Sequence, residues 1–269
     1  MRPYNQISVI VGLVLLVSLL SFLIRLPERI IDVKLFGDSW QVVFSGPWFL
    51  GLALTIAIYL GHNTLLRTHP ASCHAGLGYT LTFWPLPGLL TFLALPFLHT
   101  FSNPLLWGGG TLLLALLLAA ILLAQYNSIT IGSPLYRVAR WFLNLLAFAL
   151  AFALFFYLCQ LDAPLVASVL TLFFVSGALS LEILRQGRNS ASQTWLYALL
   201  VALVIGEMAW VLSYWSLDSL LAGLYLFWPF YLLTSVIHQH LGGRITRAAA
   251  IEFVALALVG YGVLVYYTP

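Results

Sequence analysis

The chain has 269 residues, of which 62% are hydrophobic and only 7% are charged. An ordinary soluble domain carries about 25% charged residues, so this composition cannot cover a surface that faces water. It excludes a soluble enzyme, a nucleic-acid-binding protein and a disordered protein, and it indicates a protein whose solvent is a lipid bilayer.

Long apolar stretches follow one another along the whole chain. A membrane-spanning helix needs about 20 mostly apolar residues, and the sequence contains about nine such stretches. Their approximate ranges are 7–24, 43–61, 76–99, 105–125, 141–160, 164–184, 194–214, 218–237 and 248–267. The segments between them are too short to fold alone. We therefore expect one all-α transmembrane domain over residues 1–269, a polytopic helix bundle in which the first stretch is retained as a helix.

The longest connecting segment, residues 25–42, is polar in part and follows the first stretch. Residues 30–35 alternate in part between apolar and polar side chains, residues 36–39 resemble a turn, and residues 40–44 are again apolar. This pattern predicts a short hairpin on the outer face of the membrane. It is either a plain connector or a lid over an outward-facing cavity.

Three prolines, Pro85, Pro87 and Pro96, interrupt the third stretch. Proline lacks a backbone N–H and kinks a helix. A membrane helix tolerates such a break when its neighbours satisfy the freed carbonyl groups. We therefore keep the third stretch as a spanning helix.

The arginines give the orientation. If the chain crosses about nine times, the segments on the N-terminal side carry an excess of arginine, as cytoplasmic loops do. These arginines are Arg2, Arg67, Arg137, Arg140, Arg185, Arg188, Arg244 and Arg247. The N-terminus is thus expected inside and the C-terminus outside, with a bacterial-type plasma membrane as the location.

Three of these inner loops hold an Arg-x-x-Arg pair: Arg137 with Arg140, Arg185 with Arg188, and Arg244 with Arg247. Two guanidinium groups at this spacing on a helix end face the same way and suit phosphate oxygens. They are candidates for binding anionic lipid headgroups. Topology alone also explains positive inner loops, so both interpretations stay open.

A tripeptide recurs in the third and eighth stretches. Phe83-Trp84-Pro85 and Phe227-Trp228-Pro229 each lie near the middle of their helix. Interrupted helices at matching positions of an inverted repeat are a feature of secondary transporters. Trp84, Pro85, Trp228 and Pro229 are therefore candidate ligand-binding residues, although chance in an aromatic-rich chain gives the same match.

Three carboxylates fall within the stretches. Glu182 is three residues before Arg185, which predicts an ordinary helical ion pair. Glu252 is close to Arg247 at a helix N-terminus, where a carboxylate is favoured. Glu207 has no basic residue near it on its own helix. It is interpreted as a ligand-binding or proton-carrying group, or as a structural one that bonds to a hydroxyl or to Asn144.

Histidines gather on the predicted inner side together with one cysteine. The group consists of His62, His69, Cys73, His74, His238 and His240. His and Cys are common ligands of metals and haem. The spacing matches no strong metal-binding motif, and polar residues at helix ends explain it equally well. The sequence identifies no cofactor.

Three hypotheses of function follow. The first is a non-catalytic accessory or scaffold subunit that packs against other membrane subunits, because the stretches carry few polar groups and have glycine-rich faces. The second is a permease or lipid transporter with an inverted repeat that pairs the third and eighth helices. The third is a cofactor-binding protein or intramembrane enzyme that uses the inner-face His/Cys set. The first hypothesis ranks highest, and under this hypothesis the protein is not expected to be an enzyme.

Overall fold

The computed structural model describes residues 3–23, 29–35, 38–44, 46–67, 77–99, 101–129, 134–161, 164–185, 191–215, 217–243 and 247–267. In chain order its elements are α1 (Pro3–Leu23), β1 (Arg29–Leu35), β2 (Asp38–Phe44), α2 (Gly46–Arg67), α3 (Leu77–Thr80), η1 (Leu81–Phe83), α4 (Pro85–Leu98), α5 (Pro104–Asn127), α6 (Tyr136–Gln160), α7 (Leu165–Leu184), α8 (Ala191–Leu212), α9 (Ser219–Leu241) and α10 (Arg247–Tyr267). The two strands pair antiparallel, with Arg29 opposite Phe44 and Leu35 opposite Asp38.

The helices have the length and apolarity of a multi-pass membrane protein, as predicted. Within the described ranges, seven helices are long and apolar enough to cross a bilayer, namely α1, α2 and α5 to α9. The other two predicted spans correspond to shorter apolar helices, Pro85–Leu98 and Ile251–Tyr267. The most apolar 18-residue stretch of α7 is 44% buried inside the protein, which is the highest share among these seven helices. The multi-pass helical class is thus confirmed, while nine spans and the orientation of the termini stay predictions.

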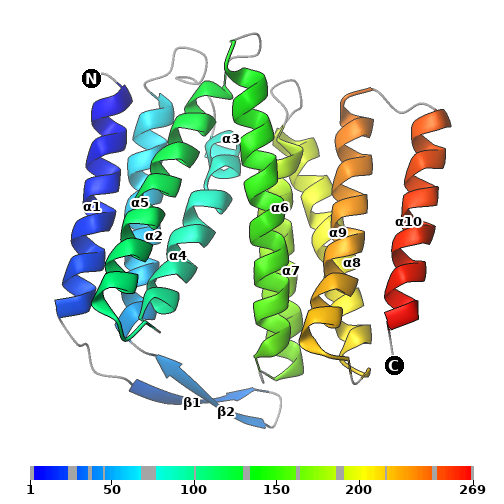
Figure 1. Cartoon of the computed structure of the whole chain (residues 1–269), viewed down its shortest axis with the longest axis horizontal. Coiled ribbons are helices and arrows are strands. Elements are labelled where there is room, and N and C mark those ends of the chain that lie inside the picture. Colours follow the sequence, from blue (N-terminus) through cyan, green and yellow to red (C-terminus); the bar gives the residue numbers. More distant parts are fainter. Residues whose placement is uncertain are drawn as a thin grey trace. The chain divides into compact units, whose positions relative to one another are not determined.

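The chain divides into two compact units, Met1–Arg140 and Trp141–Pro269. In the first unit, α1 packs against α2 and α5, and α4 packs against α2 and α5 (Figure 1). A cluster of buried side chains, among them Val14, Ile58, Leu95 and Leu118, fills the space between these helices. The first unit therefore has an apolar core of its own.

The prolines of the third predicted span distort it without ending it. The helical path runs from α3 through the 3-10 segment η1 into α4, and Thr80 and Trp84 at the two junctions keep right-handed helical backbone angles. Pro85 cannot donate to the carbonyl of Leu81, and the N–H of Trp84 donates to that oxygen at 3.4 Å instead. The tighter 3-10 bond thus replaces a bond that the proline removes.

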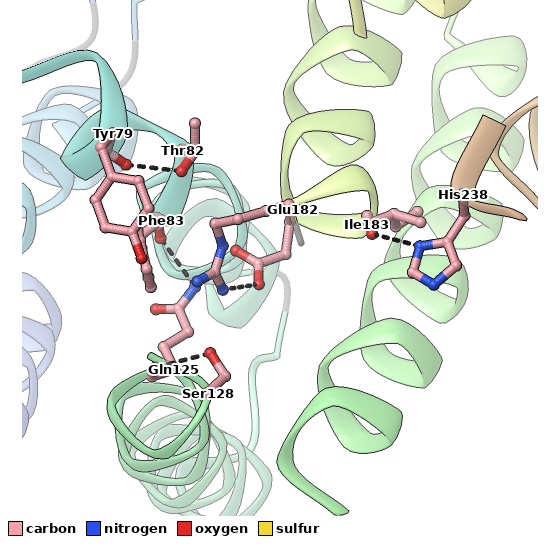
Figure 2. Close-up of polar contacts among 9 residues, drawn as sticks. Tyr79, Thr82, Phe83, Gln125, Ser128, Glu182, Ile183 and His238 are labelled. Atoms are coloured by element: carbon pink, nitrogen blue, oxygen red, sulfur yellow. Dashed lines mark hydrogen bonds and ion pairs between the residues drawn. The ribbon is translucent and has the colours of Figure 1, made fainter. Parts of the chain in front are cut away.

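The carbonyl freed by Pro87 is satisfied from a neighbouring helix. Pro87 cannot donate to the carbonyl of Phe83, four residues earlier. The side chain of Gln125 on α5 is fully buried, and its Nε2 donates to this oxygen at 2.9 Å (Figure 2). The polar side chain in the core is therefore explained by the proline in the facing helix.

Pro96 is matched by a glycine. It cannot donate to the carbonyl of Phe92, and Gly51 of α2 lies directly against this carbonyl. A Cβ atom at position 51 would come within 3.0 Å of the Phe92 oxygen. Only a residue without a side chain lets α2 approach the kinked helix this closely.

In the second unit, α9 is the central helix and contacts α7, α8 and α10. It also lies against α6, where a Cβ atom at Gly223 would come within 3.0 Å of the Phe156 backbone. Seven residues after this glycine on α9, Phe230 packs edge-on against Phe155, with ring centroids 5.4 Å apart. On its other side, Trp228 lies against Gly260 of α10, where a Cβ atom would be 2.0 Å from the indole. Gly223 and Gly260, which have no side chain, thus set how closely the helices around α9 approach.

The bond between Gln125 and Phe83 gives a prediction about stability. Gln125→Leu leaves the Phe83 carbonyl without this donor, so it should lower the free energy of unfolding by about 1–3 kcal/mol. Pro87→Ala restores an N–H that can donate to Phe83 within the helix. In that background, Gln125→Leu should cost clearly less. Thermal unfolding of the four proteins in detergent measures the difference, and an equal loss in both backgrounds would contradict the assignment.

Candidate functional site

Helices α7 and α8 form the tightest pair of the second unit. Ala198, Ala202 and Gly206 recur every four residues on α8 and face α7. A Cβ atom at Gly177 of α7 would be 3.1 Å from the Cβ of Ala202, and one at Gly206 would be 3.5 Å from Phe173. Small residues at this spacing let membrane helices approach closely.

A groove of about 510 Å³ runs along the surface of this helix pair. Three residues of α7 and five of α8 line it: Val169, Leu170, Phe173, Leu203, Gly206, Glu207, Trp210 and Val211. Gly206 contributes no side chain, which leaves room between the larger residues. The groove is apolar apart from one carboxyl group.

Glu207 is the polar member of an otherwise apolar exposed face of α8. From Trp195 to Val211, the exposed residues of this helix are Trp195, Leu196, Leu199, Leu200, Leu203, Glu207, Trp210 and Val211. Apolar side chains on this face suit lipid, whereas a carboxyl group does not. On insertion scales a charged side chain costs about 2.5–3.5 kcal/mol at the centre of a bilayer, and the cost falls toward the interfaces.

The depth of Glu207 follows from the geometry of α8. It lies five residues before the last residue of the helix, Leu212. At 1.5 Å per residue, its Cα lies about 8 Å below that helix end. One turn closer to the end, the indole of Trp210 donates to the hydroxyl of Tyr214 at 3.2 Å. Such aromatic side chains mark the membrane interface, so Glu207 lies on the hydrocarbon side of it.

No described residue forms a hydrogen bond or an ion pair with the carboxyl of Glu207. Asn144, which the sequence offered as a partner, does not line the groove. The groove therefore combines an apolar wall with a carboxyl group that no described residue pairs with.

At the other end of the same helices, polar groups are paired. Arg185 Nη2 lies 2.7 Å from Glu182 Oε1, and both side chains are buried, as the predicted ion pair requires. On α9, His238 Nδ1 lies 3.3 Å from the carbonyl oxygen of Ile183 (Figure 2). The His238 contact joins α9 to α7, and the ion pair at the end of α7 supports the structural interpretation of Glu182.

The predicted arginine pairs have different surroundings. Arg137 is exposed, whereas Arg140, three residues later, is buried. Arg185 is engaged by Glu182. Arg188 and Arg244 lie outside the described residues, as does the side chain of Arg247. Within the described residues, no Arg-x-x-Arg pair presents both of its guanidinium groups on one exposed surface. Headgroup binding therefore stays a prediction.

The described histidines do not converge. His62 is buried on α2, edge-on to Phe83 at 6.2 Å. His238 contacts α7, whereas His240 packs against Tyr197 of α8 at 6.0 Å. His69, Cys73 and His74 lie outside the described residues. Within the described ranges, no group of three His, Cys, Asp or Glu residues could hold a metal ion.

The two tryptophans of the repeated tripeptide have different surroundings. Trp84 lies against Gly88 of its own helix, whereas Trp228 lies against Gly260 of α10. Neither tryptophan, nor Pro85 or Pro229, lines the groove with Glu207.

The helix contacts of the two units agree in part with an inverted repeat. Contacts α1–α2, α2–α4 and α4–α5 have counterparts in α7–α8, α8–α9 and α9–α10. In the first unit α5 also packs against α1, while among the described residues no comparable contact joins α10 to α7. The inverted repeat therefore stays a prediction.

Sequence reasoning selected Glu207 but missed the rest of the groove. The missed residues that shape it are Phe173, Gly206 and Trp210. The signal was present, because Ala198, Ala202 and Gly206 form a small-residue stripe and Trp210 follows Glu207 at a spacing of three. Gln125 was also missed. Its signal was a polar amide within one apolar stretch, while the preceding stretch contains prolines that free backbone carbonyl groups.

The buried ion pair gives a second prediction. Glu182→Gln leaves the guanidinium of Arg185 buried without its carboxylate, so it should lower the free energy of unfolding by about 3–5 kcal/mol. Replacing both residues with apolar ones, in Glu182→Leu with Arg185→Met, should cost less than Glu182→Gln alone. Glu252→Gln, at an exposed position on α10, is the control. Thermal unfolding in detergent tests the order, and a double variant less stable than the single would contradict it.

Comparison with known proteins gives one match. The family described as "Protein of unknown function (DUF5656)" matches residues 26–267. No curated protein and no solved structure matches the chain. The family match takes in the strands and every helix from α2 to α10, and therefore both units. The chain belongs to the DUF5656 family.

Proposed function

We propose that the protein is a non-catalytic accessory or scaffold subunit of a membrane protein complex, and that it contacts another subunit through the α7–α8 groove. The observation that carries this proposal is the carboxyl of Glu207 on an otherwise apolar exposed face of α8. Lipid chains offer this group no hydrogen-bond donor. A partner protein that covers the groove would offer one and would bury the apolar residues around it.

The packing of the units supports the same function. Many buried hydroxyl groups return their hydrogen bond to their own helix, as Thr111, Ser180 and Thr234 do. Such groups are satisfied and do not mark a path for a substrate. The permease hypothesis has the distorted α3–α4 segment in its favour, but Gln125 and the 3-10 bond satisfy the carbonyls freed by Pro85 and Pro87.

The membrane is proposed to be a bacterial-type plasma membrane, with the N-terminus and the arginine-rich loops on the cytoplasmic side. This proposal comes from the arginine distribution of the sequence. The exposed guanidinium of Arg137 is available there to anionic lipid headgroups. Accessory contacts with lipid are compatible with a subunit that also binds protein.

A native mass spectrum of the full chain, extracted from its own membrane in mild detergent, tests the proposal. We expect a particle much heavier than the 29.8 kDa chain that contains at least one other polypeptide. Glu207→Gln should reduce recovery of that polypeptide about tenfold or more, which corresponds to about 1.4 kcal/mol of binding free energy.

The matched control is Glu252→Gln, which removes a carboxylate from the exposed surface of α10 and should leave recovery unchanged. A lone monomer or homodimer that carries only lipid or a small molecule would overturn the proposal.

A further inference from the structure

We infer that the segment seated in the α7–α8 groove is a transmembrane helix of the partner that carries a lysine or arginine at the depth of Glu207. This inference rests on the proposed function and specifies the chemistry of the partner. It follows from the charge, the shape and the depth of the groove.

Charge complementarity selects a cation. The groove presents one carboxyl group among apolar side chains, and no described residue pairs with it. In hydrocarbon, two opposite charges attract far more strongly than in water, since the low dielectric does not screen them. A partner cation at this depth would otherwise be as costly as Glu207 itself. Pairing offsets part of both costs.

The shape of the groove suits a helix. Its α8 side extends from Leu203 to Val211, nine residues over which the helix rises about 12 Å, or slightly more than two helical turns. Phe173 and Trp210 also line the groove, together with Gly206, whose lack of a side chain leaves space between the larger residues. A cation seated beside Glu207 would also lie next to the indole of Trp210, and indole rings attract cations.

The depth argues against a lipid headgroup. Glu207 lies about 8 Å below the end of α8, on the hydrocarbon side of Trp210 and Tyr214. Phospholipids present acyl chains at this level, and their amines lie beyond the aromatic residues. A lipid would therefore cover the apolar wall and leave the carboxyl without a partner.

Among the described residues, a second copy of the chain offers no suitable cation. Those of the strands are Arg29 and Lys34, those at helix ends are Arg67, Arg137, Arg185 and Arg247, and Arg140, the fifth residue of α6, is buried. The sequence likewise places none of them deep in a predicted span. The partner helix is therefore expected to belong to a different polypeptide.

A synthetic helix tests this inference with the full chain in phosphatidylcholine vesicles. The probe is a Leu/Ala peptide of about 21 residues, long enough to span the bilayer. It carries a fluorophore and a single lysine five residues from one end. Energy transfer to a label on the chain reports association. We expect this peptide to associate at least tenfold more strongly than the same peptide with leucine in place of lysine.

Two protein variants make the result specific. Glu207→Gln should abolish the advantage of the lysine peptide, whereas Glu252→Gln, which removes an exposed carboxylate outside the groove, should keep it. Equal association of the lysine and leucine peptides with the unaltered chain would overturn the inference. So would an advantage that survives Glu207→Gln.

The two proposals fail in different ways. If the lysine peptide shows no advantage but Glu207→Gln still releases a native partner, the subunit proposal stands and the basic helix is wrong. If the lysine peptide binds but the native particle contains no second polypeptide, the groove recognises a cationic helix and the subunit proposal is wrong. Retention of an amine-bearing lipid that depends on Glu207, in place of the peptide, would overturn the basic helix.

Discussion

The hydrocarbon core of a bilayer contains no water to satisfy a backbone N–H or C=O group, so the chain must satisfy these groups itself. Helices do so internally, and the remaining irregularities of this protein are arranged around the same requirement. Pro87 frees the carbonyl of Phe83, and Gln125 on the facing helix donates to it. Pro96 frees the carbonyl of Phe92, and Gly51 lets α2 close over it. Both of these breaks are thus matched by a particular residue on a neighbouring helix, whereas the 3-10 bond from Trp84 compensates for Pro85 within its own segment.

The same requirement makes Glu207 exceptional. Glu182 is also a carboxylate in an apolar segment, but it is buried against Arg185. The small residues Ala202 and Gly206 bring α8 close to α7, and this close packing turns Glu207 outward into the groove. No described residue pairs with its carboxyl group there. This is the reason for the proposal that the groove serves assembly.

The sequence predicted the multi-pass helical class because the length of an apolar stretch is a local property that the bilayer thickness fixes. It also predicted the Glu182–Arg185 pair, since a spacing of three on one helix is local too. It could not predict that Gln125 would meet Phe83, or that Phe173 of α7 would line the groove with Glu207. These contacts join residues distant in sequence, and they depend on how the helices pack.

The most direct test is a photo-crosslinking amino acid placed at Leu203, inside the groove, in the protein's own membrane. Leu258 lies on the exposed face of α10, outside the groove, and it is the control position. We predict one discrete adduct with another polypeptide from position 203, and no such adduct from position 258. Adducts with lipid alone at position 203, or the same products from both positions, would contradict the claim that a partner protein covers Glu207.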